Sequence, residues 1–402
     1  MQDIQLKRSL QQGIQFTQSL PPLSLYIHVP WCVRKCPYCD FNSHAIRGGE
    51  HSLGEELEQA YLRALEQDLI GVLPSVWGRP IHTVFIGGGT PSLLSAKAMD
   101  GLLTMLRNLF NLAPATEITM EANPGTVEVE KFADFAASGV NRVSLGIQSF
   151  DDESLRRLGR IHSSEQAKKA IDVAQKYFSR VNLDLMYALP YQTLEACHQE
   201  ISTALSFGTE HLSLYNLTLE PNTVFAKYPP EGLPDDDLAG DIQDLLIEET
   251  AKAGFEQYEV SAYAQNQARC LHNLNYWQFG DYIGVGPGAH GKISSHDRIV
   301  RTARVKNPES WMAKVATGEH VAEERLLMPE ELPFEFMLNA LRLKQGVPTY
   351  YFAERCGVNL SIMTGMIDEA VHKGLLVDDP MRLRATELGW RYLNDLQELF
   401  LR

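Results

Sequence analysis

Apolar residues follow two alternating patterns over the first two thirds of the chain. Short runs that are apolar almost throughout, such as LSLYIHV and HTVFI, are typical of strands covered on both faces. Longer segments with apolar residues at helical spacing separate these runs. The predicted strands are Leu23–Val29, Ile81–Ile86, Glu117–Glu121, Arg142–Ile147, Asn182–Ala188 and His211–Leu217, and the predicted helices include Gly54–Gly71, Ala96–Phe110, Glu128–Ala137 and Ser164–Phe178.

Six strand-then-helix units indicate an α/β fold with a parallel sheet, because parallel neighbours need crossover helices. Six units are too few to close an eight-stranded barrel. We therefore expect an open parallel (β/α)6 partial TIM barrel. Its functional groups should lie at the C-terminal ends of the strands.

The alternation of strand and helix patterns stops near residue 265. We therefore divide the chain into four regions. We expect a flexible N-terminal tail over 1–22, the partial barrel over 23–265, a connecting segment with short strands over 266–325, and a C-terminal domain over 326–402. The last region has helical patterns and one turn with a short strand, which predict a winged-helix-like helical domain. These patterns cover Glu330–Lys344, Tyr350–Cys356, Ser361–Lys373, the turn around Asp378–Arg384, and Ala385–Leu401.

Composition narrows the possible partners and the compartment. A net charge of -15 argues against a nucleic-acid binder and against unaided binding to anionic lipid, so peripheral membrane association would need a partner. The chain has no run of roughly 20 apolar residues that could cross a bilayer. Its Gln-rich start lacks the apolar core of a secretory signal, although Lys7 and Arg8 leave organellar targeting as an alternative. We expect a cytoplasmic protein.

Three of the six cysteines crowd into the run CVRKCPYC, directly after the first predicted strand. Secreted disulfide frameworks are spaced differently, whereas intracellular metal sites use such close groups. Cys32, Cys36 and Cys39 would supply three of the four thiolates that a four-iron cluster normally takes, which leaves one iron open. The alternative is a zinc site completed by a nearby His28, His44 or Asp40.

With this motif, the chain from about Leu23 to Leu401 resembles the radical S-adenosylmethionine (SAM) superfamily. It is more narrowly similar to the coproporphyrinogen dehydrogenase (HemN-like) branch, and within that branch to the HemW haem chaperones. The resemblance implies a [4Fe-4S] cluster on the three cysteines, with SAM on the open iron.

Further motifs at the predicted strand ends match SAM-binding positions of that superfamily. A glycine run there lets backbone approach a ligand closely, and a buried carboxylate usually has a partner. Taken singly, each residue could instead make an ordinary turn or strand-end hydrogen bond. By resemblance, the cofactor contacts are Tyr26, Tyr38, Gly88, Gly89, Thr90, Glu121, Gln148, Arg160 and Asp184.

Two departures separate this chain from the coproporphyrinogen dehydrogenases. Those enzymes carry a further cysteine two residues beyond the triad, where this chain has Phe41, and a longer arm before it. Both departures match the chaperone pattern. The block HNLNYW, which begins at His272, resembles one associated with haem binding in that family.

Imidazole is a common axial ligand of haem iron, so His272 is the first candidate for that role, with Cys270 and His290 as rivals. The resulting hypothesis is a haem chaperone that passes haem to acceptor haemoproteins, with the C-terminal domain covering the barrel or docking a partner. The alternatives are an oxygen-independent coproporphyrinogen III dehydrogenase and a radical SAM enzyme acting on another substrate.

Overall fold

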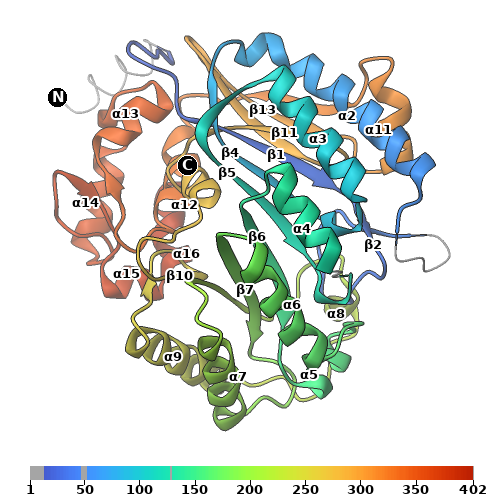
Figure 1. The fold of residues 1–402 in the computed structure, drawn as a ribbon. Coiled ribbons are helices and arrows are strands. Elements are labelled where there is room, and N and C mark those ends of the chain that lie inside the picture. Colours follow the sequence, from blue (N-terminus) through green and yellow to red (C-terminus); the bar gives the residue numbers. More distant parts are fainter. Residues whose placement is uncertain (1–12, 47–51, 127–128, 402) are drawn as a thin grey trace.

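A twelve-stranded sheet runs through the computed structural model, which describes residues 13–46, 52–126 and 129–401 (Figure 1). The strand order within these residues is β14-β13-β12-β11-β1-β4-β5-β6-β7-β8-β10-β9. The parallel strands at its centre are β1 (Leu23–Val29), β4 (Pro80–Gly88), β5 (Asn111–Ala122), β6 (Arg142–Gln148), β7 (Arg180–Tyr187) and β8 (His211–Asn216). The predicted open parallel barrel is therefore confirmed.

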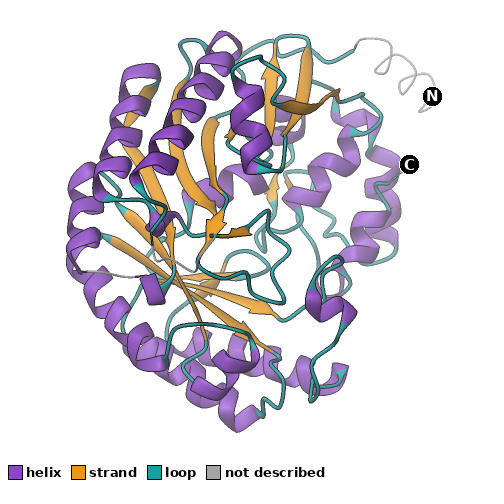
Figure 2. Cartoon of the chain, turned by 90° about the vertical axis from the view of Figure 1, so that its right-hand side faces the viewer, coloured by secondary structure: helices purple, strands orange, loops and turns teal. Residues whose placement is uncertain are grey.

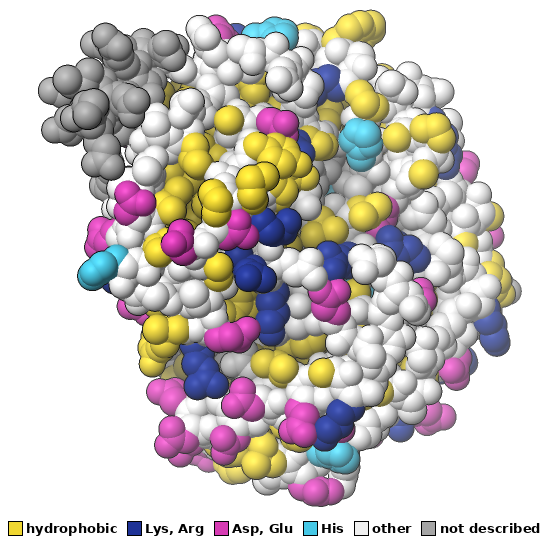
Figure 3. Space-filling view, turned by 90° about the vertical axis from the view of Figure 1, so that its left-hand side faces the viewer, with side chains coloured by type: hydrophobic (Ala, Val, Ile, Leu, Met, Phe, Trp, Pro, Cys, Tyr) yellow, Lys and Arg dark blue, Asp and Glu magenta, His cyan; other side chains and the backbone are white. Residues whose placement is uncertain are grey.

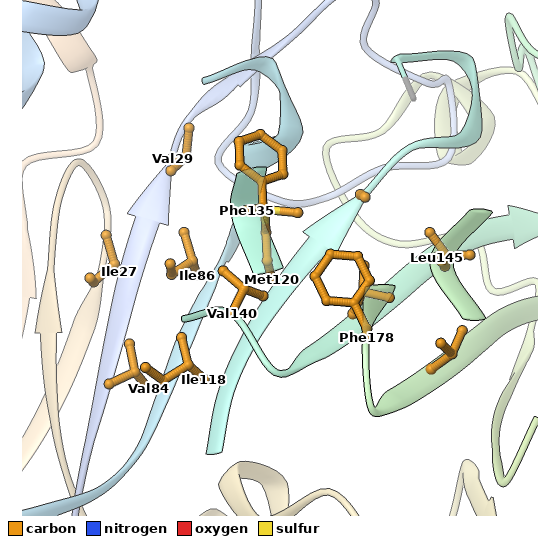
Figure 4. Packing of buried hydrophobic residues seen from close by; sticks show 14 of the residues in the cluster. Ile27, Val29, Val84, Ile86, Ile118, Met120, Phe135, Val140, Leu145 and Phe178 are labelled. Atoms are coloured by element: carbon orange, nitrogen blue, oxygen red, sulfur yellow. The ribbon is translucent and has the colours of Figure 1, made fainter. Parts of the chain in front are cut away.

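Helices follow the outer face of this curved sheet (Figure 2). They are α2 (Glu55–Val76), α3 (Ala96–Leu109), α4 (Val129–Ser138), α5 (Asp152–Arg157), α6 (Ser164–Tyr177), α7 (Leu194–Ser206) and α9 (Asp236–Lys252). Strand side chains such as Ile86 and Met120 pack with Phe135 of α4 and with Phe178, which follows α6 (Figure 4). This layer of apolar contacts between sheet and helices fixes where the strands end.

The connecting segment adds to the same sheet. Strand β11 (Asp281–Val285) pairs parallel with β1, and β12 (His290–Ser295), β13 (Arg298–Arg304) and β14 (Val321–Leu326) continue as antiparallel neighbours. Helix α10 (Leu271–Trp277) precedes β11, and α11 (Pro308–Val315) lies between β13 and β14. The six-unit prediction did not include β11, because five residues between glycines give little strand signal and the free edge of β1 decides the pairing.

The other edge is closed by β10 (Ala262–Ala264) and β9 (Glu256–Gln257), both antiparallel. Beyond the sheet lies the helical C-terminal domain, with a two-stranded β15–β16 pair. Its elements are α12 (Leu332–Ala340), β15 (Val347–Pro348), α13 (Tyr350–Cys356), α14 (Thr364–His372), β16 (Arg382–Leu383), α15 (Glu387–Arg391) and α16 (Leu393–Glu398). The single last helix that the sequence predicts is therefore two short helices, because the backbone leaves helical geometry at Tyr392.

The N-terminal tail differs from expectation in its described part. The side chains of Ile14 and Phe16 are buried in the apolar core of the C-terminal domain. The backbone N–H of Gln15 donates to the carbonyl of Gly357 at 2.7 Å, and that of Phe16 to His296 at 2.9 Å. The predicted flexibility therefore does not hold for this segment, because its apolar side chains have a core to enter. The rest of that prediction, residues 1–12, lies outside the described residues.

No helix within the described ranges is long and apolar enough to span a membrane. On the face that carries the C-terminal helices, Lys and Arg side chains are interspersed with acidic and hydrophobic ones (Figure 3).

Candidate functional site

The cysteine loop begins directly after β1 and is held by a short parallel pair, β2 (Trp31–Cys32) with β3 (His44–Ala45). The backbone N–H of Cys39 donates to the Cys36 carbonyl at 3.2 Å, which makes a tight turn. Burial raises the pKa of the Cys32 and Cys39 thiols, and neighbouring cysteines raise it further. The fold therefore gathers the three thiols at the C-terminal end of β1, as predicted.

These thiols suit a cluster better than a single ion. Among the described residues, no three His, Cys, Asp or Glu side chains gather around one ion position, which a zinc site requires. A four-iron cluster has no such requirement, because each thiolate binds its own iron. Of the zinc alternatives, His28 already shares a hydrogen bond with Tyr26 at Nδ1 and donates to the Asn42 carbonyl from Nε2, both at 2.9 Å.

The glycine run at the end of β4 is tied to the cysteine loop through backbone. The N–H of Gly89 donates to Val29 and that of Thr90 to Trp31, both at 2.7 Å. A Cβ at Gly89 would lie 2.5 Å from the Trp31 carbonyl oxygen, so only glycine permits this approach. The predicted residues Gly88, Gly89 and Thr90 therefore lie against the cysteine loop.

Glu121, at the end of β5, reaches back to this glycine loop. Its Oε2 accepts a hydrogen bond from the Gly88 N–H at 2.9 Å. Burial, followed by the nearby Asp184 carboxyl, raises the pKa of Glu121 to about 7. A buried carboxyl with so few partners would gain from a cationic group such as an ammonium.

Asp184 lies within β7, three residues before its end, rather than where the strand emerges as predicted. Its carboxylate accepts hydrogen bonds from Ser144 Oγ at 2.8 Å and Asn182 Nδ2 at 2.9 Å. Burial raises the pKa of Asp184. Asp184 therefore lies deeper in the barrel than Glu121, and its nearby carboxyl contributes to the raised pKa of Glu121.

Arg160 connects the next strand end to the cysteines. Its Nη1 lies 3.4 Å from Cys36 Sγ, and its Nη2 donates to the Gly146 carbonyl at 2.9 Å. Tyr38 lies near Cys36 and Arg160, and burial raises the pKa of its hydroxyl. Gln148 ends β6 in the left-handed region with φ 66, next to Arg160. The structure therefore brings these predicted residues to one side of the cysteine loop.

A cavity of about 1040 Å³ opens beside this group. Of the predicted residues, Tyr26, Cys39, Gly88 and Glu121 line it. Much of the remaining wall is aromatic or basic, and these residues include Lys35, Tyr276, Trp277, Tyr282, Arg301 and Lys306. Tyr276 and Trp277 belong to the block that begins at His272, whereas the other residues were missed from the sequence because they come from separate segments of the chain.

His272 is placed differently from the expected haem ligand. Its side chain is buried, with Nδ1 2.8 Å from Thr83 Oγ1 and Nε2 2.8 Å from the Tyr276 hydroxyl. Burial lowers the pKa of His272 to about 3. Both ring nitrogens are thus engaged inside the protein, and His272 does not line the cavity.

The rival candidates differ from each other. Cys270 is buried beside Glu117, and burial raises the pKa of its thiol to about 11. His290 is exposed at the start of β12 and lines the cavity.

Comparison with known proteins agrees with this arrangement. Residues 26–202 match the radical SAM superfamily, and residues 327–392 match the HemN C-terminal domain. The solved structure of coproporphyrinogen III oxidase (HemN) from Escherichia coli superposes with a TM-score of 0.80 at 22% identity, covering 99% of this chain and 93% of that one. At 22% identity, this structural likeness shows that the two chains share a fold.

Full-length relatives place the chain more narrowly. It is 47% identical to the protein named heme chaperone HemW from Escherichia coli, over 95% of this chain and 99% of the relative. The heme chaperone HemW of Bacillus subtilis is 33% identical, over 94% of this chain and 99% of the relative. Radical S-adenosyl methionine domain-containing protein 1, mitochondrial, of Bos taurus is 35% identical, over 93% of this chain and 86% of the relative. This chain therefore belongs to the radical SAM superfamily and, within it, to the HemW family.

Proposed function

We propose that this protein is a haem chaperone, which binds haem and transfers it to acceptor haemoproteins in the cytoplasm. The observation that carries the proposal is the cavity beside the cysteine loop. It joins an aromatic wall to exposed basic side chains, as a flat macrocycle with carboxylates would need. The HemW relatives from Escherichia coli and Bacillus subtilis are named heme chaperones, which supports the same ligand.

Membership of the superfamily implies a [4Fe-4S] cluster and SAM, which together supply reductive one-electron chemistry when bound. We propose that Cys32, Cys36 and Cys39 hold the cluster. The SAM site would comprise Tyr26, Tyr38, Gly88, Gly89, Thr90, Glu121, Gln148, Arg160 and Asp184. The backbone of the glycine loop lies against the cysteine loop. The Glu121 carboxyl, buried beside it, can accept a hydrogen bond from an ammonium group.

The second candidate is an oxygen-independent coproporphyrinogen III dehydrogenase. The fold shared with coproporphyrinogen III oxidase favours it. The residue two positions beyond the cysteine motif argues against it, since Phe41 stands where those enzymes carry a cysteine, and its side chain is 56% exposed.

An anaerobic assay separates the two candidates. Protein with a reconstituted cluster is mixed with SAM, dithionite and coproporphyrinogen III, and the porphyrins are then separated. We expect no product over many equivalents of substrate, together with saturable binding of one haem in a parallel titration. Sustained formation of protoporphyrinogen, or the absence of saturable haem binding, would contradict the chaperone proposal.

The cluster ligands have their own test. Cys36→Ala should abolish the roughly 400 nm absorbance of the reconstituted cluster, because thiolate ligation holds it. The buried cysteine of α7 provides a matched control, and Cys197→Ala should keep that absorbance. A full cluster in Cys36→Ala would show that this thiol is not a ligand.

A further inference from the structure

Three histidines line the cavity, and they differ in whether their ring nitrogens are free. His28 uses both nitrogens, toward Tyr26 and the Asn42 carbonyl. His44 Nε2 donates to Asn42 Oδ1 at 3.3 Å. The ring of His290 makes no hydrogen bond with any residue of the described chain, and it is exposed to the cavity. His290 can therefore bind an external group without breaking a contact.

The surroundings of His290 carry positive charge in a chain that is acidic overall. Burial, followed by the nearby charges of Lys306 and Arg301, lowers the pKa of His290, whereas Glu323 raises it. Arg301 Nη1 donates to the Tyr282 hydroxyl at 3.0 Å, while Glu335 also pairs with this guanidinium. Lys306 is exposed and has no ion pair among the residues described. Lys306 is thus free to meet a carboxylate.

A second ammonium group without an ion pair among the described residues lines the same cavity. Lys35 lines the same cavity, and its Nζ donates to the Phe41 carbonyl at 3.0 Å without an ion pair in the described chain. The two lysines therefore present separate positive charges at one opening, which suits a ligand with two carboxylates.

Part of the same cavity wall is aromatic. The rings of Tyr276 and Tyr282 meet edge to face with centroids 4.6 Å apart, and Trp277 adjoins Tyr276 at 6.4 Å. Aromatic surface of this kind packs against a flat apolar macrocycle. An imidazole, an aromatic wall and two ammonium groups without an ion pair among the described residues are thus brought together from β12, α10, β11 and two loops.

We propose that His290 is the axial ligand of the haem iron, and that Lys35 and Lys306 pair with the haem carboxylates. This inference rests on the proposed function and names the site at which it would be carried out. It moves the iron ligand from His272, whose nitrogens are both engaged, to the histidine that is free.

The iron ligand is tested by ferric haem titration of His290→Ala, with absorbance and electron paramagnetic resonance spectra. We expect a changed Soret band and roughly tenfold or greater loss of affinity, as for removal of a metal ligand or its support. Free imidazole should restore the spectrum, because it fills the space left by the side chain. His82→Ala, which removes an exposed histidine of β4 outside the cavity, is the matched control and should match the wild type.

The charged contacts are tested with metal-free protoporphyrin IX, which has the carboxylates but no iron. The double variant Lys35→Gln, Lys306→Gln should weaken its binding about tenfold, whereas His290→Ala should leave it unchanged. The dimethyl ester should bind the wild type and the double variant equally.

The outcomes separate this inference from the proposed function. If the wild type binds no haem saturably, both fail. If haem binds with an unchanged spectrum in His290→Ala while His272→Ala alters it, only the assignment of His290 is overturned. Equal binding of protoporphyrin IX by the wild type and the double lysine variant would overturn the carboxylate contacts alone.

Discussion

Two histidines from neighbouring segments show how far surroundings decide the role of one residue type. His272 lies inside α10, where its ring packs on Phe85 and Tyr276 with centroids 5.1 and 4.8 Å away. His290 begins β12 and faces the cavity. The sequence ranks His272 first because it stands in a recognisable block. In the folded chain that block is a short helix packed against the sheet, which turns His272 inward.

This burial predicts a pH dependence for His272. Its pKa is about 3 in the folded chain and near 6.5 when unfolded, so below pH 6.5 only the unfolded state takes up the proton. Stability through this residue should therefore fall as the pH drops from 6.5 toward 3, by about 2 kcal/mol at pH 5. Urea unfolding of the wild type and of His272→Gln at pH 7.5 and 5 measures this loss of stability.

The difference in free energy of unfolding between the wild type and His272→Gln should be smaller at pH 5 than at pH 7.5. His82→Gln, at an exposed position, is the control. Parallel pH curves for the wild type and His272→Gln would show that the buried ring is not the cause.

At the scale of elements, the C-terminal ends of β1 and β4 form one unit with the cysteine loop. Strand β4 continues to Gly88 because its parallel pairing with β1 extends to Val29. The backbone bonds of Gly89 and Thr90 then tie the glycine run to that loop. The contact between the glycine loop and the cysteine loop thus follows from two neighbouring parallel strands ending together.

Replacing Gly89 tests this unit. Gly89→Ala should displace the cysteine loop, because its Cβ would approach the Trp31 carbonyl and amide at 2.5 and 2.8 Å. We expect less iron and sulfide incorporated on reconstitution, and a lower melting temperature. Gly101→Ala, inside α3 with open space around it, should instead raise stability by about 0.5–1 kcal/mol. Wild-type iron content in Gly89→Ala would contradict the close packing.

Much of the site at this scale was predictable, and what was missed has one physical cause. Strand ends such as Glu121 are visible from the sequence, because apolar runs stop there and parallel strands align their C-terminal ends. The cavity wall is not visible in the same way. Tyr282, Arg301 and Lys35 belong to β11, β13 and a loop, and only the packed sheet brings them together.

At the scale of the whole molecule, two apolar cores are joined by segments far apart in the chain. The barrel has one core, and the C-terminal domain has another that also takes in Ile14 and Phe16. Helix α13 ends at Gly357, whose carbonyl accepts the Gln15 N–H. The start of the described chain therefore helps to hold the last domain in place.

Removing this contact should loosen the C-terminal domain. Phe16→Ala leaves a hole in its core, which should cost about 3 kcal/mol for a buried aromatic side chain. Thermal unfolding and hydrogen exchange of α13 measure the effect. Leu388→Ala, at an exposed position of α15, is the control and should change stability little. Unchanged exchange in α13 would show that residues 14–16 do not support that helix.

The sequence by itself determined the parallel barrel and the position of the three cysteines after the first strand, because both depend on local spacing and on the burial of each strand. The SAM contacts at the strand ends rest on the family resemblance and stay predictions. Tertiary structure alone decided that β11 extends the sheet, that Ile14 and Phe16 are buried, and that His272 points inward while His290 faces the cavity. These outcomes depend on which edges and cores remain free after the barrel forms. That competition among distant segments leaves no periodic pattern in the chain.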